Sequence, residues 1–263
     1  MNISLAAETL FHIGTFPVTN TLIVAWALAA VFIVFAILVG TRLREVPKGL
    51  QNAAEAAIEA LLRLVEGVTQ NRAQAIKFFP LVATIFLFVL FSNLVEVMPG
   101  LGTVGLQEVH EGKSIIVPFL RSASADLNFT LALALSAVIG VQVMGVAAIG
   151  AAKYAGKFLV PPWKQPYGIG TFVGLLELIG EVAKIVSFSF RLFGNIFAGE
   201  VLLTVVLVLV PYLVPLPFLF LELFVGFIQA LVFSMLTIVF LKMATEEHES
   251  GMEHVTRNMK HVP

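Results

Sequence analysis

The residues of this sequence with the most capacity for chemistry are charged side chains inside an apolar stretch. From residue 170 to residue 244 the sequence is mostly apolar, yet seven charged residues interrupt it. They are Glu177, Glu181, Lys184, Arg191, Glu200, Glu222 and Lys242. Ionisable side chains within a membrane segment are costly, and they usually mark the path of an ion or a substrate. The pattern therefore predicts an ion path.

One helical face collects most of the polar side chains around Arg191. At 100° per residue, five others fall within about 80° of it. They are Glu177, Glu181, Lys184, Ser187 and Asn195. Glu200 falls about 180° away, so its carboxylate must serve a different compartment. On the next predicted helix Glu222 and Gln229 are seven residues apart and share a face. Glu200 and Glu222 could meet across the turn between the two helices.

Arg191 needs a counter-charge. A guanidinium in lipid costs from about 2.5 to more than 10 kcal/mol, and it cannot escape by losing its proton. Glu181 and Lys184 form an i, i+3 pair and can neutralise each other. The remaining acids in or near the membrane are Glu96, Asp126, Glu200 and Glu222. We therefore expect the partner of Arg191 on another subunit. The alternative is an internal salt bridge that fastens helices together.

The apolar composition of the sequence indicates that membrane helices hold these residues in place. The sequence is 59% hydrophobic and 13% charged, which excludes an ordinary soluble fold. Apolar stretches long enough to cross a hydrocarbon core of about 30 Å predict membrane helices over 21–40, 78–97 and 127–152. Three prolines at 211, 215 and 217 divide the last third into a hairpin of helices over 170–210 and 217–244. The first of these would be on the order of 60 Å long, so we expect a strongly tilted hairpin.

A different helix is predicted between the first two spans. Over 47–70, apolar residues recur at helical spacing and charged residues occupy the opposite face, which is typical of an interfacial amphipathic helix. The fold class is thus an all-α integral membrane protein in a single membrane domain, 1–263, with about five membrane helices and one interfacial helix. Basic residues cluster after the first and third spans, which predicts that the N-terminus lies outside and the tail, 245–263, lies in the cytoplasm.

Several segments of the sequence carry these polar residues in an order typical of one family. The segment "KIVSFSFRLFGNIFAGEVLL" and the later "FVGFIQALVFSMLTIVFLKMATEEH" are similar to its last two helices. The segment "FLFVLFSNLVEVMPG", with Asn93 and Glu96 on polar positions, resembles its second span. The segment "SADLNFTLALAL", which contains Asp126, resembles the start of its third. Together these segments cover most of residues 20–248 in the expected order, and the family that they resemble is subunit a of the F-type ATP synthase.

The resemblance implies a role for each polar residue in proton translocation. Arg191 would be the stator arginine that faces the carboxylate of a rotating c-ring. Glu200, Glu222, Gln229 and Asn195 would belong to an outer aqueous half-channel, and Glu177 and Lys184 would border an inner one. Where some family members have a histidine, this sequence has Glu222.

The resemblance also implies the setting of the protein. Its partners would be the c-ring subunits, the peripheral-stalk b subunits and the rest of the ATP synthase, with protons as the transported ion and a bacterial cell membrane as the location. No cofactor is implied, and ATP synthesis would occur in partner subunits.

Other functions fit the sequence less well. A net charge of −1 argues against nucleic acid as a partner, and with no cysteine there is no thiolate metal site. The five histidines lie outside the predicted spans without ligand spacing, so we predict no metal. A proton-coupled secondary transporter is the main alternative, but it should carry paired repeats, and none is visible. An intramembrane hydrolase would need a motif such as HExxH or GxSxG, and the sequence has neither.

Overall fold

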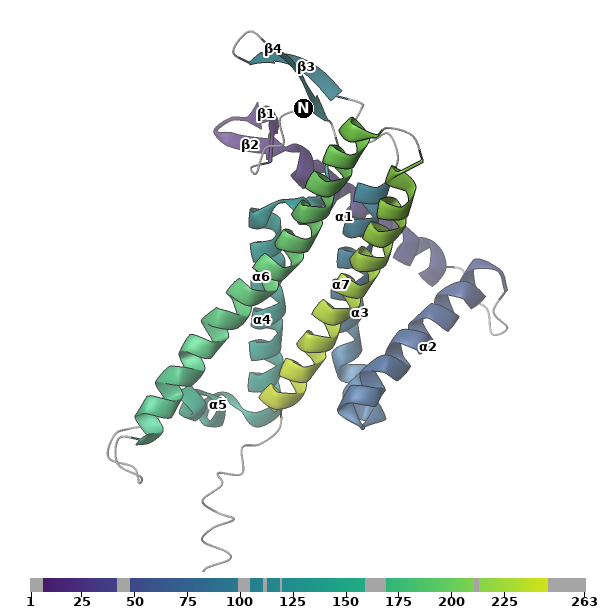
Figure 1. Ribbon diagram of the computed structural model, residues 1–263. Coiled ribbons are helices and arrows are strands. Elements are labelled where there is room, and N and C mark those ends of the chain that lie inside the picture. Colours follow the sequence, from purple (N-terminus) through teal and green to yellow (C-terminus); the bar gives the residue numbers. More distant parts are fainter. Residues whose placement is uncertain are drawn as a thin grey trace, which may run out of the picture.

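Helices make up most of the chain (Figure 1). The computed structural model describes residues 7–41, 48–98, 105–110, 113–118, 120–158, 169–210 and 213–245. Within these ranges the α-helices are α1 (Asn20–Gly40), α2 (Leu50–Thr69), α3 (Arg72–Val97), α4 (Leu127–Ile149), α5 (Ala151–Phe158), α6 (Ile169–Leu209) and α7 (Pro215–Thr245). Five of them, α1, α3, α4, α6 and α7, are long and apolar enough to cross a membrane. The predicted all-α membrane fold is confirmed.

Short polar side chains begin three of the membrane helices. Thr19, Asn71 and Asp126 precede α1, α3 and α4, and each accepts hydrogen bonds from backbone N–H groups of the following turn. Those N–H groups have no partner within the helix, so the caps stabilise each start. α4 ends at Ile149 rather than at the expected residue 152. Gly150 follows it with a φ of 92°, which favours glycine, and the chain turns there into α5.

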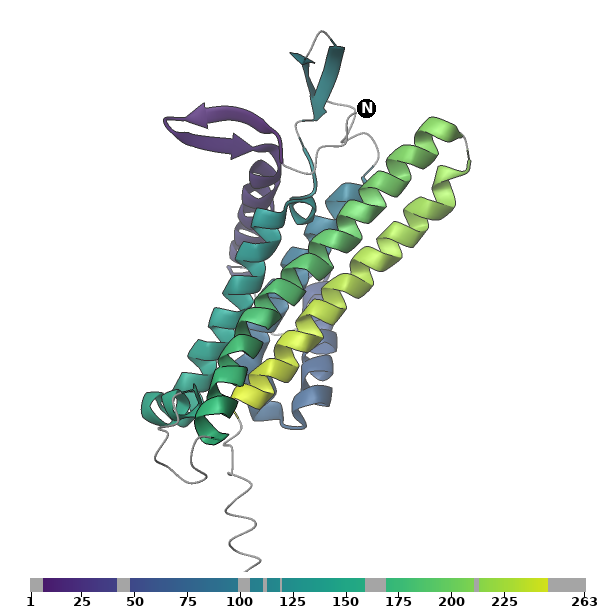
Figure 2. The ribbon, with the colours of Figure 1, turned by 60° about the vertical axis from the view of Figure 1, so that its left-hand side comes forward.

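The last two helices form a long antiparallel hairpin. α6 has 41 residues and α7 has 31, compared with 26 in α3 and 23 in α4. In Figure 1 they run side by side and cross α4 obliquely, and the view in Figure 2 agrees. α7 packs mainly on α3, and α6 packs mainly on α4. The tilt of this hairpin to the membrane normal stays a prediction.

Apolar side chains from α6 and α7 fill the space between the hairpin and the other helices. Phe233, Leu192 and Ile196 are almost fully buried, and the ring of Phe188 lies 4.7 Å from that of Phe233, centroid to centroid. The core continues onto α3 and α4 through residues such as Val89. Because α6 buries one face against this core, its opposite face is left at the surface of the chain.

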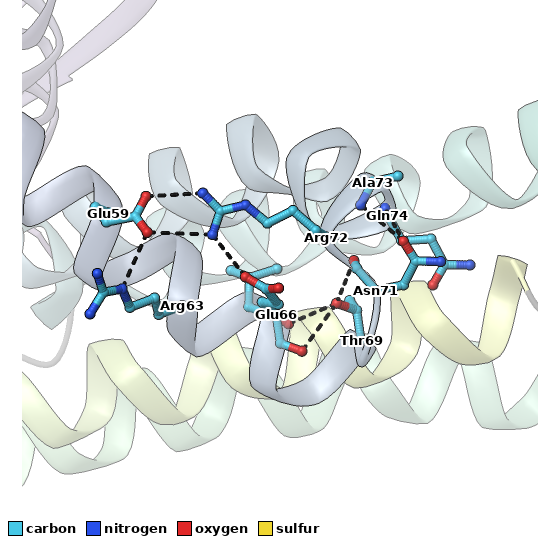
Figure 3. Close-up of polar contacts among 9 residues, drawn as sticks. Glu59, Arg63, Glu66, Thr69, Asn71, Arg72, Ala73 and Gln74 are labelled. Carbon is cyan, nitrogen blue, oxygen red and sulfur yellow. Dashed lines mark hydrogen bonds and ion pairs between the residues drawn. The ribbon is translucent and has the colours of Figure 1, made fainter.

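The amphipathic helix α2 lies against the bundle and turns sharply into α3. Leu62 and Val65 on its apolar face are buried against α3 and α7. Arg72, at the start of α3, reaches back to Glu59 and Glu66 at 3.1 and 2.8 Å (Figure 3). Hydrogen bonds from Arg72 and then from Arg63 hold the pKa of Glu59 below its usual value. These exposed ion pairs link the start of α3 to α2 at the turn between them. α3 therefore begins at Arg72, before the expected residue 78.

Two β-hairpins lie at the end of the bundle where α6 ends and α7 begins (Figures 1 and 2). One pairs β1 (Thr9–Ile13) with β2 (Phe16–Thr19), and the other pairs β3 (Gly105–His110) with β4 (Lys113–Pro118). The side-chain amide of Asn20 donates to the Pro118 carbonyl at 3.2 Å, which joins α1 to the second hairpin. We call this end of the bundle the β end and the opposite end, where α5 lies, the α5 end.

Candidate functional site

A cluster of charged side chains lies between the helices near the β end. Glu96 comes from α3, Glu200 from α6 and Glu222 from α7, and Arg121 comes from the loop before α4. The charges of Arg121, Glu200 and Glu222 all act on Glu96. Glu222 is only 7% exposed, and both carboxylate oxygens of Glu96 are buried. The structure therefore brings together three acids that are far apart in the sequence.

A glycine on α6 allows one of these acids to approach. A Cβ atom at Gly199 would overlap Oε1 of Glu222, so any larger residue would displace this carboxyl. Glu200 is the next residue along α6, and its charge acts on Glu222. Glu200 and Glu222, which were expected to approach each other across the turn, lie close enough for their charges to interact, and Gly199 provides the space for Glu222.

Most of the unsatisfied buried polar atoms of the described residues form a track that leads away from this cluster. Seven buried side-chain atoms have no hydrogen-bond partner there, and six of them come from only four residues of α3 and α7. The four are Asn93, Glu96, Glu222 and Gln229. Each such atom costs about 1–3 kcal/mol if it stays dry. These groups therefore need protons or water as partners, and we call them the polar track.

The polar track reaches α6 near the middle of the hairpin. Asn195 donates its amide to Oε1 of Gln229 at 2.9 Å, and Asn93 donates to the Gly226 carbonyl at 3.0 Å. These bonds join α3, α6 and α7 through amide side chains. Asn195 is one helical turn from Arg191, so the track ends next to the arginine.

Arg191 lies on the exposed face of α6. Its side chain makes no hydrogen bond or ion pair with any residue that the structure describes, whereas Leu192 beside it is fully buried. Ser187 and Asn195 are exposed on the same face. An internal salt bridge, the alternative reading of this arginine, is therefore not formed among the described residues. Arg191 is thus left at the surface of the chain.

Ion pairs dominate at the α5 end. Lys184 lies 2.6 Å from Glu181, which is the expected i, i+3 pair, and Lys157 of α5 lies 2.6 Å from Glu177 of α6. The Lys184 ammonium also lies 4.5 Å from the centre of the Phe240 ring, close enough for a cation–π contact. The acids and bases at this end thus neutralise each other.

Tyr154 of α5 belongs to the same region. Its hydroxyl donates to Oε1 of Gln142 at 2.5 Å. Burial raises the pKa of Tyr154 to about 12, with further contributions from the charges of Glu181 and Glu177. The phenol therefore stays protonated over the physiological pH range.

Asp126 has a clear local role in the structure. One carboxylate oxygen caps α4 by accepting from the N–H of Asn128, and the other accepts from the Thr21 hydroxyl at 2.9 Å. The prediction that Asp126 takes part in proton transfer is untested, but both of its oxygens are committed to these bonds.

Arg121 is not among the site residues expected from the sequence. In the structure it forms an ion pair with Glu200 at 2.7 Å, and it is only 8% exposed. The sequence did contain a signal that Arg121 is close to the membrane helices, because it directly precedes the small, polar "SASAD" segment that leads into one of them.

By its fold and its buried charges, the chain is a polytopic α-helical membrane protein. The family model described as ATP synthase A chain matches residues 22–242. The ATP synthase subunit a of Campylobacter jejuni is 33% identical over 244 residues, which cover 91% of this chain and 90% of that protein. The chain belongs to the ATP synthase A chain family.

Two further relatives give the same picture. ATP synthase subunit a of Moorella thermoacetica is 30% identical over 232 residues, covering 88% of this chain and 93% of that protein. ATP synthase subunit a 1 of Syntrophotalea carbinolica is 34% identical over 223 residues, covering 85% and 84%. The matched segments cover between 84% and 93% of each relative's own length.

Proposed function

We propose that this chain is the stationary proton-translocating subunit of a rotary ATP synthase. Membership of the ATP synthase A chain family supports the assignment to this complex. The observation that carries the proposal is Arg191, an exposed guanidinium without a partner among the described residues, in a 41-residue apolar helix. Such a charge requires an anion, and a carboxylate on a neighbouring c-ring would supply it.

The electrostatics of Arg191 explain how it would drive transport. A fixed cation favours the ionised form of a nearby carboxyl. A ring carboxyl that approaches Arg191 therefore gives up its proton to water of the inner path, and rotation then carries the ionised carboxylate to the outer path, where it takes up another proton. The same charge repels a proton that would otherwise cross directly between the two sides. A membrane potential supplies about 2.3 kcal/mol per charge per 100 mV, which is enough to bias the direction.

The two polar regions fit two offset half-channels. In this proposal the charged cluster and the polar track form the outer path, which runs from Glu96, Glu200 and Glu222 to Gln229 and Asn195. The unsatisfied buried atoms of the track support a hydrated route. The paired residues at the α5 end, Glu177, Glu181 and Lys184 among them, border the inner path.

The wider setting follows from the same proposal. The chain is not catalytic itself, and it works with the c-ring, the b subunits of the peripheral stalk and the catalytic part of the complex. It lies in a bacterial cell membrane with its N-terminus outside and its C-terminus in the cytoplasm. The β end then faces outward, and the α5 end faces the cytoplasm.

Replacing the arginine tests the proposal. Arg191→Ala should abolish ATP synthesis in membrane vesicles while the complex still assembles. The reason is that the ring carboxyl loses the nearby positive charge that favours release of its proton. Passive proton leak should rise as the barrier disappears. Arg63→Ala, an exposed arginine on α2, is the matched control and should synthesise ATP normally. Normal synthesis by Arg191→Ala would reject the proposed role.

A further inference from the structure

The loop before α4 presents an arginine to the charged cluster. Nη2 and Nε of Arg121 both donate to Oε2 of Glu200, at 2.7 and 3.2 Å. The two residues are 79 positions apart, and their contact joins the loop to α6. Two charge-assisted bonds onto one oxygen orient the carboxylate as well as balance its charge.

Buried hydrogen bonds hold this loop against three helices. Ser122 donates its hydroxyl to the Ser92 carbonyl of α3 at 2.9 Å, and the Ser124 N–H donates to the Ser92 hydroxyl at 3.2 Å. Two residues later, Asp126 caps α4 and accepts from Thr21 of α1. Ser92, Ser122 and Ser124 are all buried. Arg121 is thus carried on a fixed support, and its position is defined by α1, α3 and α4.

The charges of the cluster do not balance if every acid is ionised. Glu96, Glu200 and Glu222 face one described cation, Arg121. Burying unpaired carboxylates is strongly unfavourable. Glu200 receives both bonds from the guanidinium, whereas the carboxylate oxygens of Glu96 and Glu222 have no hydrogen-bond partner among the described residues. One acid is therefore matched by the arginine, and the other two are left to carry protons.

We propose that Arg121 is a positioning residue of the outer path, which holds Glu200 as a carboxylate so that Glu222 is the acid that exchanges the proton. The inference rests on the proposed function and assigns different roles to two acids of the cluster, a fixed charge to Glu200 and proton exchange to Glu222. Glu222 takes one proton from outer water, passes it toward the ring carboxylate and returns to the ionised form. Glu200 keeps its charge throughout, because Arg121 stays bound to it.

The test uses vesicles that contain the complete ATP synthase, with ATP-driven proton pumping measured per assembled complex. Arg121→Gln should lower pumping by about tenfold or more, because Glu200 loses its partner and its orientation. Arg121→Lys should recover most of this loss by restoring the charge. Arg63→Gln, the same change at an exposed arginine, should pump like the unmodified protein.

A second pair of variants separates positioning from simple fastening. Adding Glu200→Gln to Arg121→Gln should cause at most about a twofold further loss, because the two side chains act as a unit. The exchange of Arg121→Glu with Glu200→Arg keeps the link between the loop and α6, so it should assemble, but it should pump at less than about a tenth of the normal rate.

Two results would overturn the inference. The first is normal pumping by Arg121→Gln, which would show that Glu200 needs no arginine partner. The second is normal pumping by the exchanged pair, which would show that no carboxylate is needed at position 200. Failure of the wider proposal is distinguishable, because it would appear as ATP synthesis by Arg191→Ala whatever the Arg121 variants do.

Discussion

The two ends of the hairpin formed by α6 and α7 handle charge in opposite ways. At the α5 end, Lys157 pairs with Glu177 and Lys184 pairs with Glu181. At the β end, three acids share one described arginine, and two of them have no hydrogen-bond partner among the described residues. An excess of acids can store and pass protons, whereas a balanced set of ion pairs cannot do so without breaking a pair. In the proposed function, this difference favours proton uptake at the β end and a fixed set of charges at the α5 end.

The largest effect is expected from neutralising one acid at each end. Glu222→Gln should lower ATP-driven proton pumping by about 100-fold, because it removes the unpaired acid of the cluster. Glu177→Gln, at the α5 end, should lower pumping by no more than about threefold. Pumping is measured in vesicles and normalised to assembled complex. Equal losses in the two variants would remove the proposed difference between the ends.

A glycine substitution tests the geometry of the β end next. Gly199→Ala places a methyl group where Oε1 of Glu222 lies, so we expect about a tenfold loss of pumping as the carboxyl is displaced. Shortening the acid with Glu222→Asp in the same chain should recover part of the rate. Gly180→Ala is the control on the same helix, since a Cβ there meets no atom within 4 Å. A normal rate in Gly199→Ala would show that the close approach has no role in transport.

Breaking an ion pair at the α5 end should affect stability more than transport. Lys157→Gln leaves Glu177 without its partner, and the free energy of unfolding should fall by about 1 kcal/mol, because the pair is partly exposed. Thermal unfolding in detergent measures this change, and pumping should stay within about twofold of normal. The double variant with Glu177→Gln should regain stability. A transport defect larger than the stability defect would contradict a structural role.

The smallest effect concerns Tyr154 and high pH. Because its pKa in the folded protein is raised to about 12, its phenol contributes stability that is fully present below about pH 10 and is lost between about pH 10 and 12. Tyr154→Phe should remove this part of the pH dependence and leave pumping at neutral pH unchanged. Tyrosinate absorbance during alkaline titration gives the measurement. A transition for Tyr154 near pH 10 would mean that the residue is not buried beside these acids.

Much of the fold could be predicted because lipid leaves few structural choices. Long apolar stretches must be helical, so the helices now labelled α1, α3, α4, α6 and α7 follow from composition and length alone. The start of α3 was harder to predict, because its first turns carry the charged residues Arg72 and Lys77 and lie before the apolar stretch. The two β-hairpins were not predicted, because they are short and lie outside the apolar stretches whose length carries the membrane signal.

The candidate site also has a part that the sequence predicts and a part that it does not. The face shared by Ser187, Arg191 and Asn195 follows from helical spacing, and so does the pairing of Glu181 with Lys184. The partner of Glu200 does not, because helical periodicity relates only residues of one helix, and Arg121 belongs to a loop 79 positions away. The surplus of acids at the β end likewise appears only when three helices and a loop are brought together.

The first membrane helix also differs from the others in how it is held. Its buried residues, Asn20, Thr21, Val24 and Ala25, all lie in the first two turns, and only 11% of its most apolar window is buried inside the chain. Further along, Phe32 rests on the ring of Phe91 at 5.3 Å. The protein thus holds α1 mainly at its N-terminal end, and the rest of the helix is surrounded by lipid acyl chains. Bilayer thickness, rather than protein packing, then sets the angle of this helix.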